Sequence, residues 1–147
     1  MAMLFITGCA LTASQSTAAP HAPVTPLEVV EPGRLARHAT HLIRAREGNI
    51  DVVLLGDSIT AGFPEDLVIQ AFGGRVANFG LPADRAQHVL WLLEQGILDD
   101  YQARLVMLMI GTNNLKSGPV RESPQETAHA VAAVAAAVRR KQPQARL

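Results

Sequence analysis

Cysteine, aromatic residues and net charge are all scarce in this 147-residue chain. A single cysteine, Cys9, excludes a disulfide framework and a cysteine-rich metal cluster. Aromatic residues make up only 4%, and 13 basic residues balance 13 acidic ones, which argues against a nucleic-acid-binding surface. No apolar run in the sequence reaches the roughly 18 residues that a membrane-spanning helix requires. What is abundant is hydrophobic sequence, at 48%, which is enough for one globular domain with a substantial core.

Residues 1–33 are typical of a leader followed by a linker. The stretch ITGC at 6–9 resembles the end of a bacterial lipoprotein signal, which would make Cys9 a point of lipid attachment. No Lys or Arg precedes Cys9, so a chance Gly-Cys pair, or a cleavage site within residues 16–22, is the alternative. Four prolines within residues 20–33 predict an extended, unpaired linker. We expect export, to the periplasm, to a membrane as a lipoprotein, or into the medium.

Residues 34–147 alternate between amphipathic and β-branched segments. A helix is expected over 34–47, with an apolar stripe made of Leu35, Ala39, Leu42 and Ile43. Buried strands are expected at 50–55, 75–80 and 104–111. Such strand-helix-strand units predict a parallel sheet covered by helices on both sides.

Two further helices carry start signals. Asp84, followed by Gln87, has the spacing of a capping box, and an apolar face follows it up to Ile97. Ser123 and Glu126 form a second capping box around Pro124, ahead of a stripe made of Val131, Val134 and Val138. Each of these helices follows one of the predicted strands, as the alternating pattern requires.

Polar residues suited to catalysis follow each predicted strand, where parallel sheets collect their chemistry. Ser58 comes directly after the first strand, in the sequence Gly-Asp-Ser, where Asp57 could hold the turn through its side chain. A serine in that place is either a nucleophile or a plain helix cap. The N–H groups of Gly80 and Ser58 and the side-chain amide of Asn113 are suitable donors for an oxyanion. Each has an ordinary structural explanation alone, but their coincidence favours a hydrolase.

These blocks resemble a known family. GDSIT, NFGLPAD and GTNN, in that order, resemble the first three blocks of the SGNH (GDSL-type) hydrolase superfamily, and the chain is most similar to the branch that holds the platelet-activating-factor acetylhydrolase catalytic subunits. The resemblance covers residues 34–147 and implies a flavodoxin-like three-layer α/β/α sandwich, here with about three strands. It implies ester hydrolysis without metal or organic cofactor. Ser58 would be the nucleophile, and Ser58, Gly80 and Asn113 would form the oxyanion hole.

The sequence departs from the family pattern in two ways. Pro82 stiffens the second loop, and the Asp-x-x-His block that supplies the family's base does not appear before the last residues, KQPQARL. His88 is expected to be a structural histidine and His129 a surface residue, because neither has a carboxylate from another loop to orient it. We therefore expect 34–147 to be the N-terminal part of a hydrolase domain, truncated at its C-terminus.

The favoured function is a serine esterase that removes acetyl or short acyl groups, with carbohydrate esters as the expected substrates and no nucleic-acid partner. A lysophospholipase-type lipid esterase is one alternative, and an inactive binding module for acylated glycans is another. A nucleotide or flavin binder is disfavoured because no Gly-x-Gly-x-x-Gly loop opens a helix in this sequence.

Overall fold

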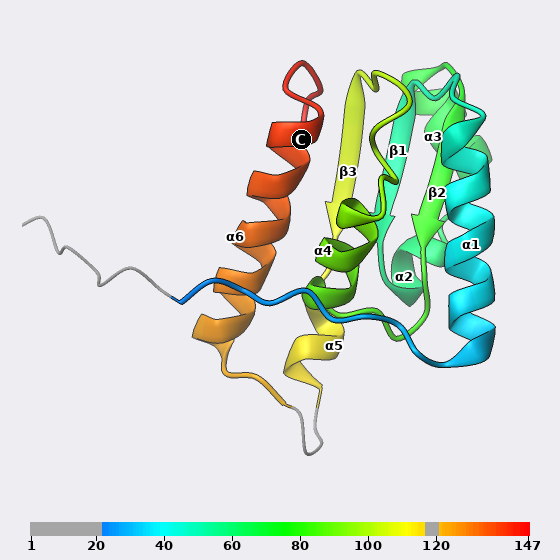
Figure 1. Ribbon diagram of the computed structural model, residues 1–147. Coiled ribbons are helices and arrows are strands. Elements are labelled where there is room, and N and C mark those ends of the chain that lie inside the picture. The colour runs from blue at the N-terminus through cyan, green and yellow to red at the C-terminus, as the bar shows by residue number, and fades with distance from the viewer. Residues whose placement is uncertain (1–21, 117–120) are drawn as a thin grey trace, which may run out of the picture.

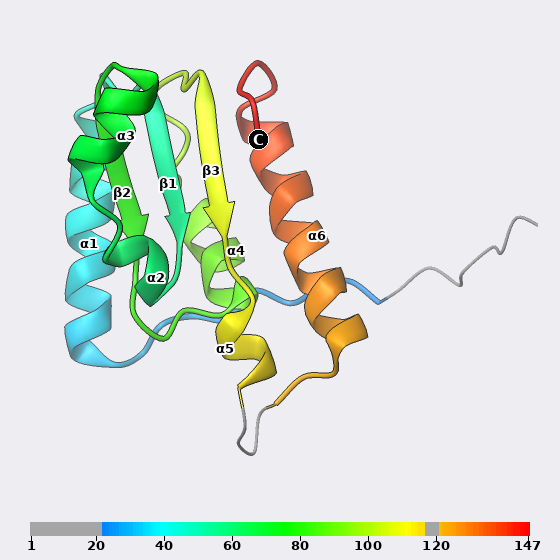
Figure 2. The same ribbon diagram turned by 180° about the vertical axis from the view of Figure 1, so that it is seen from behind.

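The computed structural model describes residues 22–116 and 121–147. The predicted signal and the lipid attachment at Cys9 lie outside the described residues. Three parallel strands form the centre of the fold, and helices cover both faces of the sheet (Figures 1 and 2). None of the helices in the described ranges is long and apolar enough to cross a membrane. The architecture is the predicted incomplete α/β sandwich.

The strand register determines where the site can form. The strands are β1 (Val52–Gly56), β2 (Val76–Gly80) and β3 (Leu105–Met109), in the order β2-β1-β3. Gly56 is the register partner of both Gly80 and Met109, so the three carboxyl ends are level. From β1 the chain goes on to form β2 on one side of that strand, and it later forms β3 on the other side. Ligands bind where the strand order reverses in this way, outside the carboxyl ends of the strands.

The helices divide between the two faces of the sheet. They are α1 (Pro32–Arg46), α2 (Ser58–Ala61), α3 (Glu65–Phe72), α4 (Ala86–Glu94), α5 (Thr112–Leu115) and α6 (Pro124–Lys141). Helices α1, α4 and α6 lie on one face, which is toward the viewer in Figure 1, and α2 and α3 lie on the other (Figure 2). The short helices α2 and α5 both lie at the carboxyl edge of the sheet.

The larger core lies beneath α1, α4 and α6. The alternate residues Val53 and Leu55 of β1 face it, together with Phe79 of β2. The intervening residues Val52 and Leu54 face a smaller cluster under α3. A strand that is apolar on both faces is the expected pattern for the centre of a parallel sheet, and it fixes the position of the residues that follow Gly56.

One edge of the sheet is only partly covered. The outer edge of β3 carries a single parallel bridge, from Leu105 to Arg146, and the Val106 N–H donates to the Arg146 carbonyl at 2.8 Å. Beside it runs an apolar groove of about 460 Å³. The groove is lined by Leu54, Thr60, Phe63, Leu147 and the residues of β3.

Two predictions about the N-terminal part were wrong in detail. In α1 the buried residues are His38 and Ala45, whereas Leu35 is 42% and Ile43 is 60% exposed. Leu42 of the predicted stripe does pack against the core, next to Ala45. The buried face of α1 is therefore mixed, because it also meets buried charge, as described below. The segment 22–30 is extended, but it is not unpaired, since the Leu27 N–H donates to the Gln87 carbonyl at 3.0 Å.

The predicted cap of α4 was also wrong. The N-cap residue is Arg85, and its backbone N–H donates to His88 Nδ1 at 2.9 Å. The Asp84 side chain does not cap the helix, and it is fully buried, in contact with Arg34 of α1. In contrast, the capping box of Ser123 and Glu126 at the start of α6 is present as predicted.

Candidate active site

Ser58 is the first residue of α2, directly beyond the end of β1. It is exposed, while the preceding Asp57 is fully buried and accepts the Ile59 N–H on Oδ1 at 2.9 Å. Gly56 leaves no room for a side chain, because a Cβ there would lie 2.1 Å from the Met109 carbonyl oxygen. The tight junction of β1, α2 and β3 therefore holds the Ser58 hydroxyl at the rim of the sheet.

Gly80 ends β2, beside α2, the helix that Ser58 begins. A Cβ at Gly80 would lie 2.3 Å from the Ala61 nitrogen, so glycine is required for α2 to approach this closely. The Gly80 N–H donates to Asn78 Oδ1 at 2.9 Å, and Asn78 Nδ2 donates to the Thr60 carbonyl at 2.7 Å. Asn78 thus links α2 to β2. It also accepts the hydrogen bond of the Gly80 N–H, which the sequence suggested as an oxyanion donor.

The loop after β2 offers a different donor at Ala83. This residue is exposed and has φ +67°, a left-handed conformation that is uncommon for alanine. Among the described residues, no group accepts a hydrogen bond from the Ala83 N–H. The sequence did not point to Ala83, since nothing in an alanine signals a left-handed backbone. The neighbouring Pro82 was the only sign of a turn.

Asn113 lies in α5, at the same rim. It is half-buried, and its Nδ2 donates to the Asp84 carbonyl at 2.8 Å, which leaves the second amide hydrogen for another acceptor. The adjacent Asn114 is fully buried, and its Oδ1 accepts the Ala86 N–H at 3.0 Å. These two asparagines join α5 to the loop after β2. The structure therefore brings the three predicted loops together at one edge.

The histidines of the described residues are occupied away from Ser58. His88 caps α4 from within the core, as expected of a structural histidine. His38 stacks edge-on against Trp91 at 5.3 Å, and His41 packs against Phe79 at 5.6 Å between ring centroids. Burial lowers the pKa of His41 and of His88 to about 4. His129 is half-buried, not a freely solvated surface residue, and its Nε2 lies 2.9 Å from the Ala22 carbonyl oxygen.

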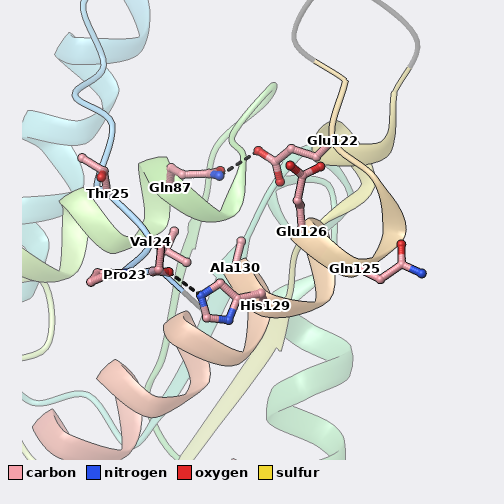
Figure 3. Close-up of a pocket in the computed structure, with 10 residues that line it drawn as sticks. Pro23, Val24, Thr25, Gln87, Glu122, Gln125, Glu126, His129 and Ala130 are labelled. Carbon is pink, nitrogen blue, oxygen red and sulfur yellow. Dashed lines mark hydrogen bonds between the residues drawn. The ribbon is translucent and has the colours of Figure 1, made fainter. Parts of the chain in front are cut away.

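A hollow of about 570 Å³ lies outside this rim, between residues 22–25 and helices α4 and α6 (Figure 3). Ser58, Gly80 and Asn113 do not line it. Its two carboxylates already have partners. Glu122 accepts from Gln87 at 2.7 Å (Figure 3), and Glu126 caps the start of α6. We therefore place the candidate active site at the carboxyl rim and not in this hollow.

No group of acidic, histidine or cysteine side chains in the described ranges is arranged to hold a metal ion. The chemistry that the rim itself can perform is that of a hydroxyl surrounded by hydrogen-bond donors. Such an arrangement suits acyl transfer, in which fixed donors stabilise a developing oxyanion.

Comparisons with known proteins agree with this chemistry. The model of the GDSL-like Lipase/Acylhydrolase family matches residues 54–147. A Drosophila melanogaster platelet-activating factor acetylhydrolase IB subunit beta homolog is 34% identical over 110 residues, which is 74% of this chain and 47% of that protein. The alpha1 subunit from Rattus norvegicus is 30% identical over 132 residues, which is 87% of this chain and 55% of that protein.

The fold has a solved counterpart. A Streptococcus pneumonia protein described as a platelet activating factor superposes with a TM-score of 0.50 at 21% sequence identity, over 77% of this chain and 53% of that one. The chain spans about half the length of the curated relatives that it matches. By its sequence blocks, its topology and the family match, the chain belongs to the GDSL-like lipase/acylhydrolase family.

Proposed function

We propose that this chain provides the nucleophile and the oxyanion-binding groups of a serine esterase that removes acetyl or other short acyl groups. The observation that carries the proposal is the convergence of Ser58, the loop after β2 and Asn113 at one rim, with Asn113 Nδ2 bonded to the Asp84 carbonyl at 2.8 Å. The names of the relatives, which are acetylhydrolases, support acetyl as the acyl group.

In the proposed reaction, Ser58 Oγ attacks the ester carbonyl carbon while a general base takes the hydroxyl proton. The carbonyl oxygen becomes an oxyanion, which accepts hydrogen bonds from the Ser58 N–H and from Asn113. The alcohol then leaves with the proton, and water hydrolyses the acyl-serine. Each of the four described histidines packs against, or bonds to, a group other than Ser58, so we assign the base to the later Asp-x-x-His block that the family resemblance implies.

For the remaining oxyanion donor, the contacts favour Ala83 over Gly80. The Gly80 N–H already donates to Asn78 Oδ1 at 2.9 Å, and Asn78 also holds α2 in place. The Ala83 N–H has no acceptor among the described residues and belongs to the residue before Asp84, whose carbonyl holds Asn113. Using Gly80 would require Asn78 to release it, whereas Ala83 requires no rearrangement.

The test uses the full-length protein and p-nitrophenyl acetate. Ser58→Ala should lower kcat by at least about a thousandfold. Asn113→Ala should lower kcat by about a hundredfold while KM changes little, because the lost donor acts on the transition state. Thr40→Ala, an exposed hydroxyl on α1, is the matched control and should behave as the wild type. Equal activity in Ser58→Ala and wild type would overturn the nucleophile assignment.

The same variants also test which alcohol the substrate ester contains. Acetylated xylan represents the carbohydrate esters that the sequence favoured, and an acetylated phospholipid represents the class named by the relatives. If the wild type hydrolyses one of these two esters faster, and Ser58→Ala does not hydrolyse it, that ester represents the substrate class. Binding of acetylated xylan without hydrolysis of any ester would instead support an inactive glycan-binding module.

A further inference from the structure

Asp84 connects the proposed oxyanion-binding loop to the rest of the molecule. Its carbonyl accepts a hydrogen bond from Asn113 Nδ2 at 2.8 Å, and its own N–H donates to the Leu81 carbonyl at 3.2 Å. It also directly follows Ala83. The position of the Asp84 backbone therefore determines the direction of two of the proposed donors, the Asn113 amide and the Ala83 N–H.

The Asp84 side chain is fully buried, and a cation from α1 contacts it. Arg34 Nη2 lies 2.5 Å from Asp84 Oδ1. The nearest histidine nitrogens lie farther from the carboxylate. His38 Nε2 is 3.7 Å from Asp84 Oδ2, and His88 Nδ1 is 3.9 Å from Asp84 Oδ1. Burial lowers the pKa of His88 to about 4, so this ring is neutral near pH 7. Arg34 is thus the charged group in direct contact with the Asp84 carboxylate among the described residues.

Arg34 is itself held in place. It lies in the first turn of α1, where the Glu31 side chain accepts the N–H groups of Gly33 at 2.9 Å and Arg34 at 2.7 Å. Its side chain is 24% exposed, so most of the side chain is out of water. The family match begins at residue 54, so this contact comes from a helix outside the matched region.

We propose that Arg34 is a positioning residue, which holds the oxyanion-binding loop in place through its ion pair with the buried Asp84 carboxylate. Without the guanidinium, the carboxylate would be left buried and uncompensated, and it would move toward water and take the backbone of the loop with it. Oxyanion donors work only when they are fixed in advance at the correct place. This inference rests on the proposed esterase function for its catalytic consequence.

The kinetic test compares two arginines of the same helix in the full-length protein. Arg34→Met should lower kcat for p-nitrophenyl acetate by about tenfold, less than Asn113→Ala, because the donors are misplaced and not removed. KM should change little. Arg34→Lys keeps the charge and should recover part of the loss. Arg37→Met, an exposed position on α1, is the matched control and should leave kcat unchanged.

A second measurement does not depend on activity. The side-chain amide NMR signals of Asn113, assigned by their loss in Asn113→Ala, should shift in Arg34→Met and stay in place in Arg37→Met. If Ser58→Ala remained active, the esterase proposal would fail, yet these signals would still decide whether Arg34 positions Asn113. Unchanged Asn113 signals in Arg34→Met, together with unchanged kcat, would overturn the inference.

A double variant covers the case in which Arg34→Met does not fold. Arg34→Met combined with Asp84→Asn removes both charges, so no uncompensated carboxylate remains to unfold the protein. We expect this variant to fold, with shifted Asn113 signals and kcat still about tenfold low. Wild-type signals and wild-type kcat in the double variant would show that the ion pair has no positioning role.

Discussion

At the scale of single residues, Ala83 combines an unfavourable backbone conformation with a proposed catalytic role. Its φ of +67° places the Cβ of an L-residue close to the following carbonyl oxygen, which costs roughly 1–2 kcal/mol. Within residues 22–116 and 121–147, the other non-glycine residue with positive φ is Asn49, at +54°, and asparagine tolerates this region better. Strain of this kind persists where surrounding contacts hold it, and here the neighbouring Asp84 is held by Arg34 and Asn113.

Replacing Ala83 with glycine should therefore stabilise the protein. Ala83→Gly relieves the steric cost, and we expect the free energy of unfolding to rise by about 1 kcal/mol, measured by urea denaturation of the full-length protein. Ala132→Gly is the matched control, because the same change at an exposed position within α6 should lower stability by about 1 kcal/mol. A loss of stability in Ala83→Gly would show that the loop is not strained at this position.

At the scale of elements, the contact between α2 and the end of β2 holds the proposed nucleophile, Ser58, in place. Gly80→Ala would place a Cβ 2.3 Å from the Ala61 nitrogen, so α2 would have to shift. We expect a loss of about 1–3 kcal/mol in the free energy of unfolding from this overpacking, together with a fall in kcat, since Ser58 begins α2. The measurements are a urea titration and the p-nitrophenyl acetate assay.

The matched control is Gly62→Ala, at the C-cap of α2. The nearest atom to a Cβ at Gly62 is the Ser58 carbonyl oxygen at 3.5 Å, an ordinary contact, so stability should change by no more than about 0.5 kcal/mol. Equal stability of Gly80→Ala and Gly62→Ala would mean that α2 adapts to the extra methyl group. Gly80 would then have no special packing role.

The sequence predicted the positions of the helices and strands better than it predicted which face of a helix is buried. The strands were evident because β1 is apolar on both faces and each strand is followed by a turn or polar loop. The buried face of α1 was only partly predicted. Its periodicity indicated Leu42, which packs against the core, but it cannot reveal that the helix also packs through His38 and Arg34 onto a buried aspartate. Aspartate is a common N-cap residue, so the sequence favours Asp84 as the N-cap of α4. Only the contact of Asp84 with Arg34 of α1 explains why Arg85 is the N-cap instead.

The sequence predicted which loops meet at the candidate site, but not which atoms in those loops are available as hydrogen-bond donors. Ser58 and Asn113 follow strand ends, and parallel strands bring such loops together. Which N–H of the second loop is available depends on the side chain of Asn78 and on the backbone of Ala83. Both are consequences of packing that no local pattern in the sequence contains.

At the scale of the whole molecule, the half-buried imidazole of His41 and the buried imidazole of His88 make stability depend on pH. Burial lowers the pKa of His41 and of His88 from 6.5 to about 4. In the unfolded chain these groups take up protons near their ordinary pKa, whereas in the folded protein they stay neutral until about pH 4. Their contribution to stability is therefore complete above pH 6.5 and is lost progressively as the pH falls from 6.5 toward 4.

Urea denaturation at pH 7 and pH 5 checks this dependence. We expect a lower free energy of unfolding at pH 5, and a smaller difference between the two pH values in His41→Leu, which has one fewer buried imidazole to protonate. His41 is the better choice, since its Nδ1 is buried with no hydrogen-bond partner, whereas His88 caps α4. An equal difference in His41→Leu and wild type would exclude this histidine as a source of the acid sensitivity.

The ion pair between Arg34 and Asp84 also bears on how the protein should be prepared for experiments. A recombinant fragment trimmed to the family alignment would begin at residue 54 and would lack α1 entirely. Such a fragment would retain Ser58 and Asn113, but it would bury an aspartate without its arginine and would expose the flank of β2 that α1 covers. An inactive or insoluble product from that fragment would reflect the choice of cloning boundary, so expression vectors should start no later than Glu31, which caps the helix.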